Sequence, residues 1–138
     1  DGAADLQRDR LSADLIGIDG YDAESPVEAL STPAFYRDCA RVLGESGIMV
    51  VNLWGGDRNF TTCVNRLDRA FDGLIACLPA GKPGNIAAFA FKRSPGQPTW
   101  RELNARAREL ESIYELEFTR FARELAVMNP HDDERLLL

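Results

Sequence analysis

Short apolar runs alternate with amphipathic helical stretches through the first ninety residues, and this alternation constrains the fold more than any other feature of the sequence. One run, ADLIGID, ends in a carboxylate, and another, IMVVNLW, is rich in β-branched residues; both are typical of buried strands. Thr32 followed by Pro33 is a strong helix start. We expect strands at 13–19, 48–54, 74–78 and 86–91, and helices at 33–43 and 60–71.

Strand, helix, strand, helix, strand is the pattern of a parallel α/β sheet with right-handed crossovers. The third and fourth strands lie close enough in sequence to pair as a hairpin, which predicts one antiparallel strand near an edge. Gly44 and Gly47 are expected to end the first helix. Three or four strands make about half of such a sheet, and the chain opens at Asp1 without a Met, so we expect it to be the C-terminal piece of a longer protein.

A composition break at 94–98 (SPGQP) separates this α/β part from two further helical stretches. Thr99 and Glu102 have the spacing of a capping box, and apolar residues then recur at helical intervals. The sequence therefore predicts an α/β unit over 1–95 and a helical extension with a tail over 96–138. The polar end of the chain, with its three terminal leucines, is expected to be mobile unless a partner holds it.

Charge and cysteine content narrow the function classes. The chain has 22 acidic residues against 16 basic ones, a net charge of −6, which argues against a nucleic-acid surface and suits a cationic ligand. No apolar run approaches the length of a membrane span. The three cysteines are expected to be buried reduced thiols, and the single histidine, His131, leaves little material for a zinc site or a histidine-dependent triad.

Asp19 and Asp22 are the residues most able to carry chemistry. Ligands of open parallel sheets bind beyond the carboxyl ends of the strands, and Asp19 ends the first expected strand. Two carboxylates there could hold an ammonium group or take a proton from an amine. The alternative, that Asp19 caps a turn and Asp22 is simply solvated, stays open. Asn52 could face a ligand or satisfy a strand end, and Trp54 could line a pocket or lie in the core.

The order and spacing of several segments within about 1–93 resemble the C-terminal half of the spermidine synthase (polyamine aminopropyltransferase) family. The segments that carry the resemblance are 1–6, 14–22, 30–43 and 47–52. The family has the Rossmann-like fold of class I S-adenosylmethionine-dependent methyltransferases. The resemblance therefore implies the C-terminal portion of a Rossmann-like, mostly parallel sheet with a terminal antiparallel hairpin strand, followed by C-terminal helices.

The resemblance also implies roles for individual residues. Asp1 and Gly2 would recognise the adenine of a nucleoside, Asp19 would orient and deprotonate the attacking amine, and Asp22 would bind an amine of the substrate. Tyr21, where the family usually has a small residue, would lie against the same substrate. No metal is implied.

The implied reaction is transfer of an aminopropyl group from decarboxylated S-adenosylmethionine to a polyamine. The resemblance predicts a cytoplasmic enzyme with small-molecule nucleoside and amine substrates and no tightly bound cofactor. It predicts no nucleic-acid partner and no membrane partner, and the expected assembly is a homo-oligomer. Two alternatives remain: a methyltransferase of the same fold that uses S-adenosylmethionine itself, and a non-catalytic family member or dimerisation module. The chain by itself is expected to be inactive.

Overall fold

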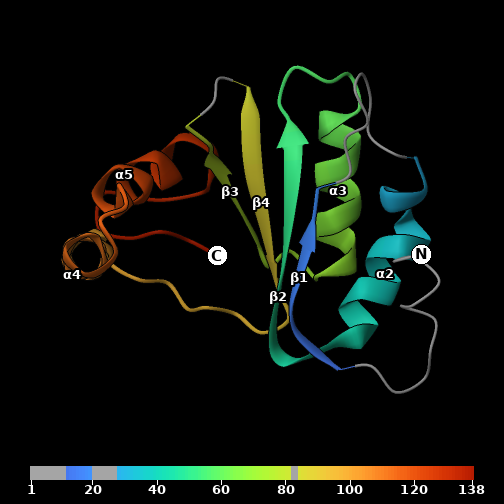
Figure 1. Ribbon diagram of the computed structural model, residues 1–138, viewed down its shortest axis with the longest axis horizontal. Coiled ribbons are helices and arrows are strands. Elements are labelled where there is room, and N and C mark those ends of the chain that lie inside the picture. Colours follow the sequence, from blue (N-terminus) through green and yellow to red (C-terminus); the bar gives the residue numbers. More distant parts are fainter. Residues whose placement is uncertain (1–11, 20–27, 82–83) are drawn as a thin grey trace.

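The computed structural model describes residues 12–19, 28–81 and 84–138. Strands and helices alternate from residue 13 to residue 79, as the sequence predicts, and a further strand and two helices follow. Figure 1 shows the helices at 33–42 and 60–70 to one side of the sheet and those at 100–114 and 118–128 at the opposite side of the picture, beside the strand at 75–79. In chain order the elements are β1 (Ala13–Ile18), η1 (Glu28–Leu30), α2 (Pro33–Val42), β2 (Leu43–Trp54), α3 (Phe60–Ala70), β3 (Ile75–Pro79), β4 (Asn85–Phe91), α4 (Trp100–Tyr114) and α5 (Phe118–Met128).

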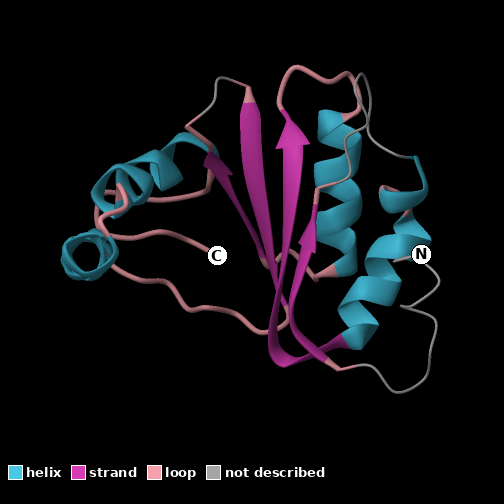
Figure 2. Cartoon of the chain, in the orientation of Figure 1, coloured by secondary structure: helices cyan, strands magenta, loops and turns pink. Residues whose placement is uncertain are grey.

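The four strands form one sheet in the order β1-β2-β4-β3 (Figure 2). β1 and β2 are parallel, while β4 runs antiparallel to both β2 and β3. The expected hairpin between β3 and β4 is confirmed, and its antiparallel strand lies one place in from the edge. Three of the four strands therefore point the same way, and among the described strand pairs β1 with β2 is parallel and the other two are antiparallel.

The start of α2 is as predicted, but its end is not. Thr32 Oγ1 accepts a hydrogen bond from the Phe35 amide at 3.1 Å, and Pro33 occupies the first turn. The expected glycine stop is wrong, because α2 ends at Val42 and β2 begins directly at Leu43. Between the pairs Ala13–Leu43 and Leu15–Ile48 the register shifts, so Gly44 and Gly47 lie in an irregular stretch of the strand. A Cβ on Gly47 would lie 2.8 Å from Leu43 Cδ2, which explains a glycine there.

The core lies between the sheet and the helices α2 and α3. Its largest fully buried side chains are Tyr36, Met49, Leu67 and Cys39. The cysteines Cys39, Cys63 and Cys77 are all buried free thiols, as expected, and burial raises the pKa of Cys39 to about 12.

β1 differs from the expected fully buried strand. Leu15 is 65% exposed and Gly17 is also exposed, whereas Ile16 and Ile18 pack toward the core. Alternate residues of a strand point to opposite faces. Among the described residues α2 and α3 cover one face of the sheet. α5 contacts β3, the strand at the sheet edge opposite β1.

α5 is joined to the edge strand β3 by one buried side chain. Asn129, which is 7% exposed, accepts a hydrogen bond from the Cys77 amide and donates one to the Cys77 carbonyl, both at 2.7 Å. The side-chain amide thus makes the pair of bonds that a neighbouring strand would make. The division of the chain at 95/96 remains a prediction.

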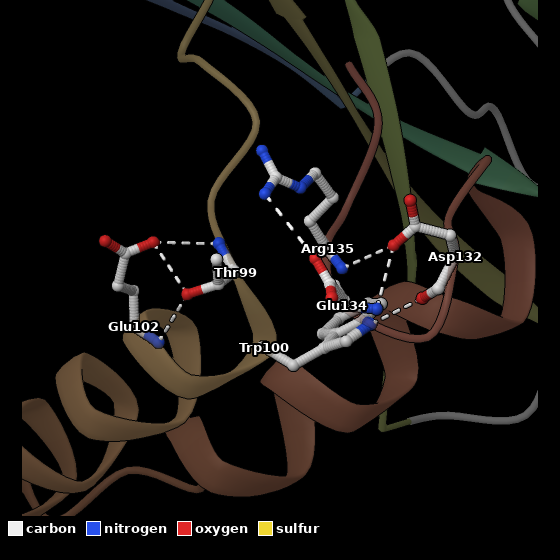
Figure 3. Close-up of polar contacts among 6 residues, drawn as sticks. All are labelled: Thr99, Trp100, Glu102, Asp132, Glu134 and Arg135. Carbon is white, nitrogen blue, oxygen red and sulfur yellow. Dashed lines mark hydrogen bonds and ion pairs between the residues drawn. The ribbon is translucent and has the colours of Figure 1, made fainter.

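The C-terminal tail lies against the start of α4. The predicted capping box is present, with Thr99 and Glu102 bonded to each other in both directions (Figure 3). Trp100 Nε1 donates to the Asp132 carbonyl at 2.9 Å, and the Trp100 amide donates to the Glu134 carbonyl at 2.9 Å. Leu136 is 2% exposed. These hydrogen bonds join the tail to the start of α4, and the expected mobility of the tail stays a prediction.

Candidate active site

Asp19 lies directly beyond β1, at the edge where β1 and β2 both end. The parallel register pairs Gly17 with Val50 and Ile18 with Val51, so the next step brings Asp19 level with Asn52. Asn52 Nδ2 donates a hydrogen bond to Asp19 Oδ1 at 3.0 Å. Asp19 is exposed and follows the end of a strand, as the sequence predicts, and its role toward a ligand stays a prediction.

The hydrogen bond from Asn52 fixes the orientation of the Asp19 carboxylate. The amide must present its NH₂ group to this carboxylate, because its oxygen would meet the carboxylate oxygen as a second acceptor. In the described part of the chain, Asn52 is the single hydrogen-bond partner of Asp19, which leaves acceptor capacity for an incoming N–H group. The site can therefore hold an amine and accept a proton from it.

Asn52 is a site residue whose role the sequence left undecided. Its side chain meets Asp19, 33 residues away in sequence, and this contact was not visible from either residue type alone. A polar residue near the carboxyl end of an otherwise apolar strand was the available signal.

Trp54 shares the Asn52 face of β2, two residues closer to the strand end. Its side chain is not in the core, since Trp54 is 52% exposed. Gly84 and Gly56 lie against the indole: Cβ atoms built on them would fall 3.6 Å and 2.4 Å from the nearest indole atoms. The absence of a side chain at Gly56 leaves room for the ring, which presents an aromatic surface near the same edge of the sheet as Asp19.

The other predicted site residues lie outside the described part of the chain. These are Asp1, Gly2, Tyr21 and Asp22. Their roles, and the proximity of Asp22 to Asp19, stay predictions. Among residues 12–19, 28–81 and 84–138, no group of three His, Cys, Asp or Glu side chains is placed to hold a metal ion.

Curated relatives match the chain from end to end. A polyamine aminopropyltransferase of Chromobacterium violaceum is 39% identical over 138 residues, and one of Neisseria meningitidis serogroup A is 36% identical over the same length. This chain is similar to the polyamine aminopropyltransferases along its whole length. The resemblance predicted from the sequence is confirmed, and it extends past residue 93 through the C-terminal helices. The chain spans about half the length of these relatives, 53% and 52%.

Solved spermidine synthases share the fold of this aminopropyltransferase-like chain. A probable spermidine synthase from Corynebacterium glutamicum aligns with a TM-score of 0.62 at 20% identity, covering 80% of this chain and 43% of that one. A spermidine synthase in complex with the transition state analogue AdoDATO aligns with a TM-score of 0.60 at 20% identity, covering 92% of this chain and 49% of that one. The predicted Rossmann-like α/β class is thus confirmed. No protein-family model matches the chain.

Proposed function

We propose that the protein to which this chain contributes transfers an aminopropyl group from decarboxylated S-adenosylmethionine to a polyamine. The observation that carries the proposal is the Asp19 carboxylate, held by Asn52 at the open carboxyl edge of the sheet. Similarity to polyamine aminopropyltransferases over all 138 residues supports it. The net charge of −6 also favours a cationic substrate over an anionic one.

The proposed reaction needs a neutral, well-placed amine. Its nitrogen attacks the carbon next to the sulfonium, a C–N bond forms, the C–S bond breaks, and methylthioadenosine leaves with the sulfur electron pair. The amine nitrogen then carries an extra proton, which Asp19 accepts. The sulfonium is already a good leaving group, so the main work of the protein is to position the amine and to remove its proton.

The remaining predicted residues complete this proposed site. Asp22 would bind a second amine of the acceptor, Tyr21 would lie against it, and Asp1 with Gly2 would recognise the adenine. The exposed indole of Trp54 suits the same ligand, because a cationic amine is attracted to the face of an aromatic ring.

We also propose the setting in which the enzyme works. The substrates are a nucleoside and an amine, no cofactor stays tightly bound, and the assembly is a homo-oligomer in the cytoplasm. None of the described helices combines the length and the apolar character needed to cross a membrane.

Product analysis of the full-length protein tests the proposal against its two alternatives. The protein is incubated with putrescine and either decarboxylated S-adenosylmethionine or S-adenosylmethionine. Release of methylthioadenosine with the first donor is the expected result. Release of S-adenosylhomocysteine with the second donor would assign a methyltransferase instead. No product with either donor, over a range of amine acceptors, would leave the non-catalytic reading.

A further inference from the structure

A hollow between α2 and α3 is lined by three arginines. It measures about 140 Å³ and is bounded by Arg37 and Pro33 of α2 and by Arg66, Arg69 and Ala70 of α3. These helices lie on the side of the sheet shown at the right of Figure 1. Among the described residues, the hollow shares no lining residue with the Asp19–Asn52 pair.

The three guanidinium groups lack carboxylate partners in the part of the chain that the structure describes. Arg66 Nη1 donates to the Ser31 carbonyl at 2.9 Å, a contact that leaves its charge uncompensated. Other helical arginines form ion pairs with carboxylates. Arg106 Nη1 lies 2.7 Å from Glu109 Oε2, and Arg120 Nη1 lies 3.1 Å from Glu117 Oε2. Three like charges gathered around one hollow, in a chain of net charge −6, repel one another unless an anion sits between them.

The hollow is bordered by two helix ends of opposite partial charge. Pro33 is in the first turn of the ten-residue helix α2, and the amino end of a helix carries a partial positive charge. Arg69 and Ala70 lie in the last turn of α3, whose carboxyl end carries a partial negative charge, so the two helix ends offset each other. The attraction for an anion therefore comes from the three guanidinium groups.

We propose that this hollow binds a phosphate group, either as inorganic phosphate or as the terminal group of a small phosphomonoester. Guanidinium groups bind phosphate oxygens through paired N–H donors, and a tetrahedral dianion can accept from several of them at once. A volume of about 140 Å³ is small beside the 300–1,000 Å³ of pockets for drug-sized ligands, so one phosphate group is the part of a ligand that it encloses. The proposal is independent of the proposed transferase activity.

Side-chain NMR of the full-length protein tests the site directly. Inorganic phosphate is titrated at constant ionic strength while the Nε–H resonances of Arg37 and Arg69 are followed. We expect saturable shifts of these resonances, with glycerol phosphate as a second arm that distinguishes a phosphomonoester source from the free ion. Acetate serves as the monoanion control and is expected to give no saturable shift.

Variants separate this site from general attraction of anions. Arg37 and Arg69 are exposed, so Arg37→Gln with Arg69→Gln should leave the fold intact, and we expect it to raise the Kd for phosphate at least tenfold by calorimetry. Arg101→Gln with Arg108→Gln removes the same charge from exposed positions on α4 and is expected to leave this Kd unchanged. Equal weakening by both double variants, acetate binding as tight as phosphate, or no saturation with either phosphate ligand would overturn the proposal.

Discussion

At the scale of single residues, the contact between Asp19 and Asn52 concentrates the proposed chemistry. The carboxylate is exposed and oriented by one hydrogen bond of 3.0 Å. Asp19 therefore performs its proposed role without being part of the core. Its replacement is expected to change the reaction rate and to leave the fold intact.

Asp19→Asn should abolish most turnover in the full-length protein. An amide cannot accept the proton of the attacking amine, and positioned general bases contribute on the order of 10²–10⁴ in rate. We expect kcat to fall by at least about 10²-fold, measured as methylthioadenosine release, with an unchanged melting temperature. Asp14→Asn, an exposed carboxylate on the same strand, is the matched control. Near-native activity of Asp19→Asn would remove this residue from the mechanism.

Asn52→Ala tests whether the amide acts through the carboxylate. Without its hydrogen bond the Asp19 side chain samples other rotamers, so we expect kcat to fall about tenfold, with little change in KM for the nucleoside. The decisive measurement is a double-mutant cycle. If Asn52 works only by orienting Asp19, Asn52→Ala should cost nothing further in the Asp19→Asn background, whereas additive losses would give Asn52 a separate role.

At the scale of elements, Asn129 connects the end of α5 to the edge strand β3. Its amide satisfies both backbone groups of Cys77 and also donates to the Leu125 carbonyl at 2.6 Å. A side chain thereby closes part of a strand edge that would otherwise present free donors and acceptors.

Asn129→Ala should lower the free energy of unfolding more than Asn104→Ala does. It leaves the buried N–H and C=O of Cys77 without partners, which costs about 1–3 kcal/mol in the free energy of unfolding. Asn104→Ala is the matched control, since Asn104 bonds only to the Trp100 carbonyl within its own helix. Urea unfolding of the two variants measures the difference. A loss no greater for Asn129→Ala than for Asn104→Ala would contradict the connecting role.

At the scale of the whole molecule, two acidic side chains stabilise the local backbone on either side of the contact between the start of α4 and the chain's end: Glu102 at the helix start and Asp132 in the tail. Hydrogen bonds from Thr99 lower the pKa of Glu102, and backbone hydrogen bonds from Glu134 and Arg135 lower the pKa of Asp132. Figure 3 shows the two carboxylates on either side of the Trp100 contact with the tail. Both groups are exposed, so each contributes modestly and the effect is reduced by salt.

These lowered pKa values predict a loss of stability in acid. A carboxylate with a folded-state pKa below its unfolded value contributes stability above the unfolded pKa, and this is lost as the pH falls through the folded pKa. We expect the tail to detach between about pH 5 and pH 3. The rate of hydrogen exchange at the Leu136 amide measures this detachment. Glu102→Gln with Asp132→Asn should flatten this dependence. Unchanged acid sensitivity in that variant would assign it to other carboxylates.

Much of the fold could be predicted from the sequence because helix caps and strand periodicity depend on residues only two or three positions apart. The Thr32 and Thr99 caps each depend on residues three positions apart, and strand periodicity depends on neighbours two apart. The boundary between α2 and β2 was predicted wrongly because two glycines resemble a helix stop, whereas here they lie in the irregular start of a strand.

The sequence by itself determined the alternation of strands and helices, the position of Asp19 at a strand end and the similarity to aminopropyltransferases. Tertiary structure alone decided which distant groups meet: Asn52 with Asp19, Asn129 with Cys77, and the chain's end with Trp100. The physical reason is range. Caps and periodicity follow from backbone geometry over a few residues, whereas contacts across 32 to 52 residues depend on strand order, register and helix packing, which form only when the chain has folded.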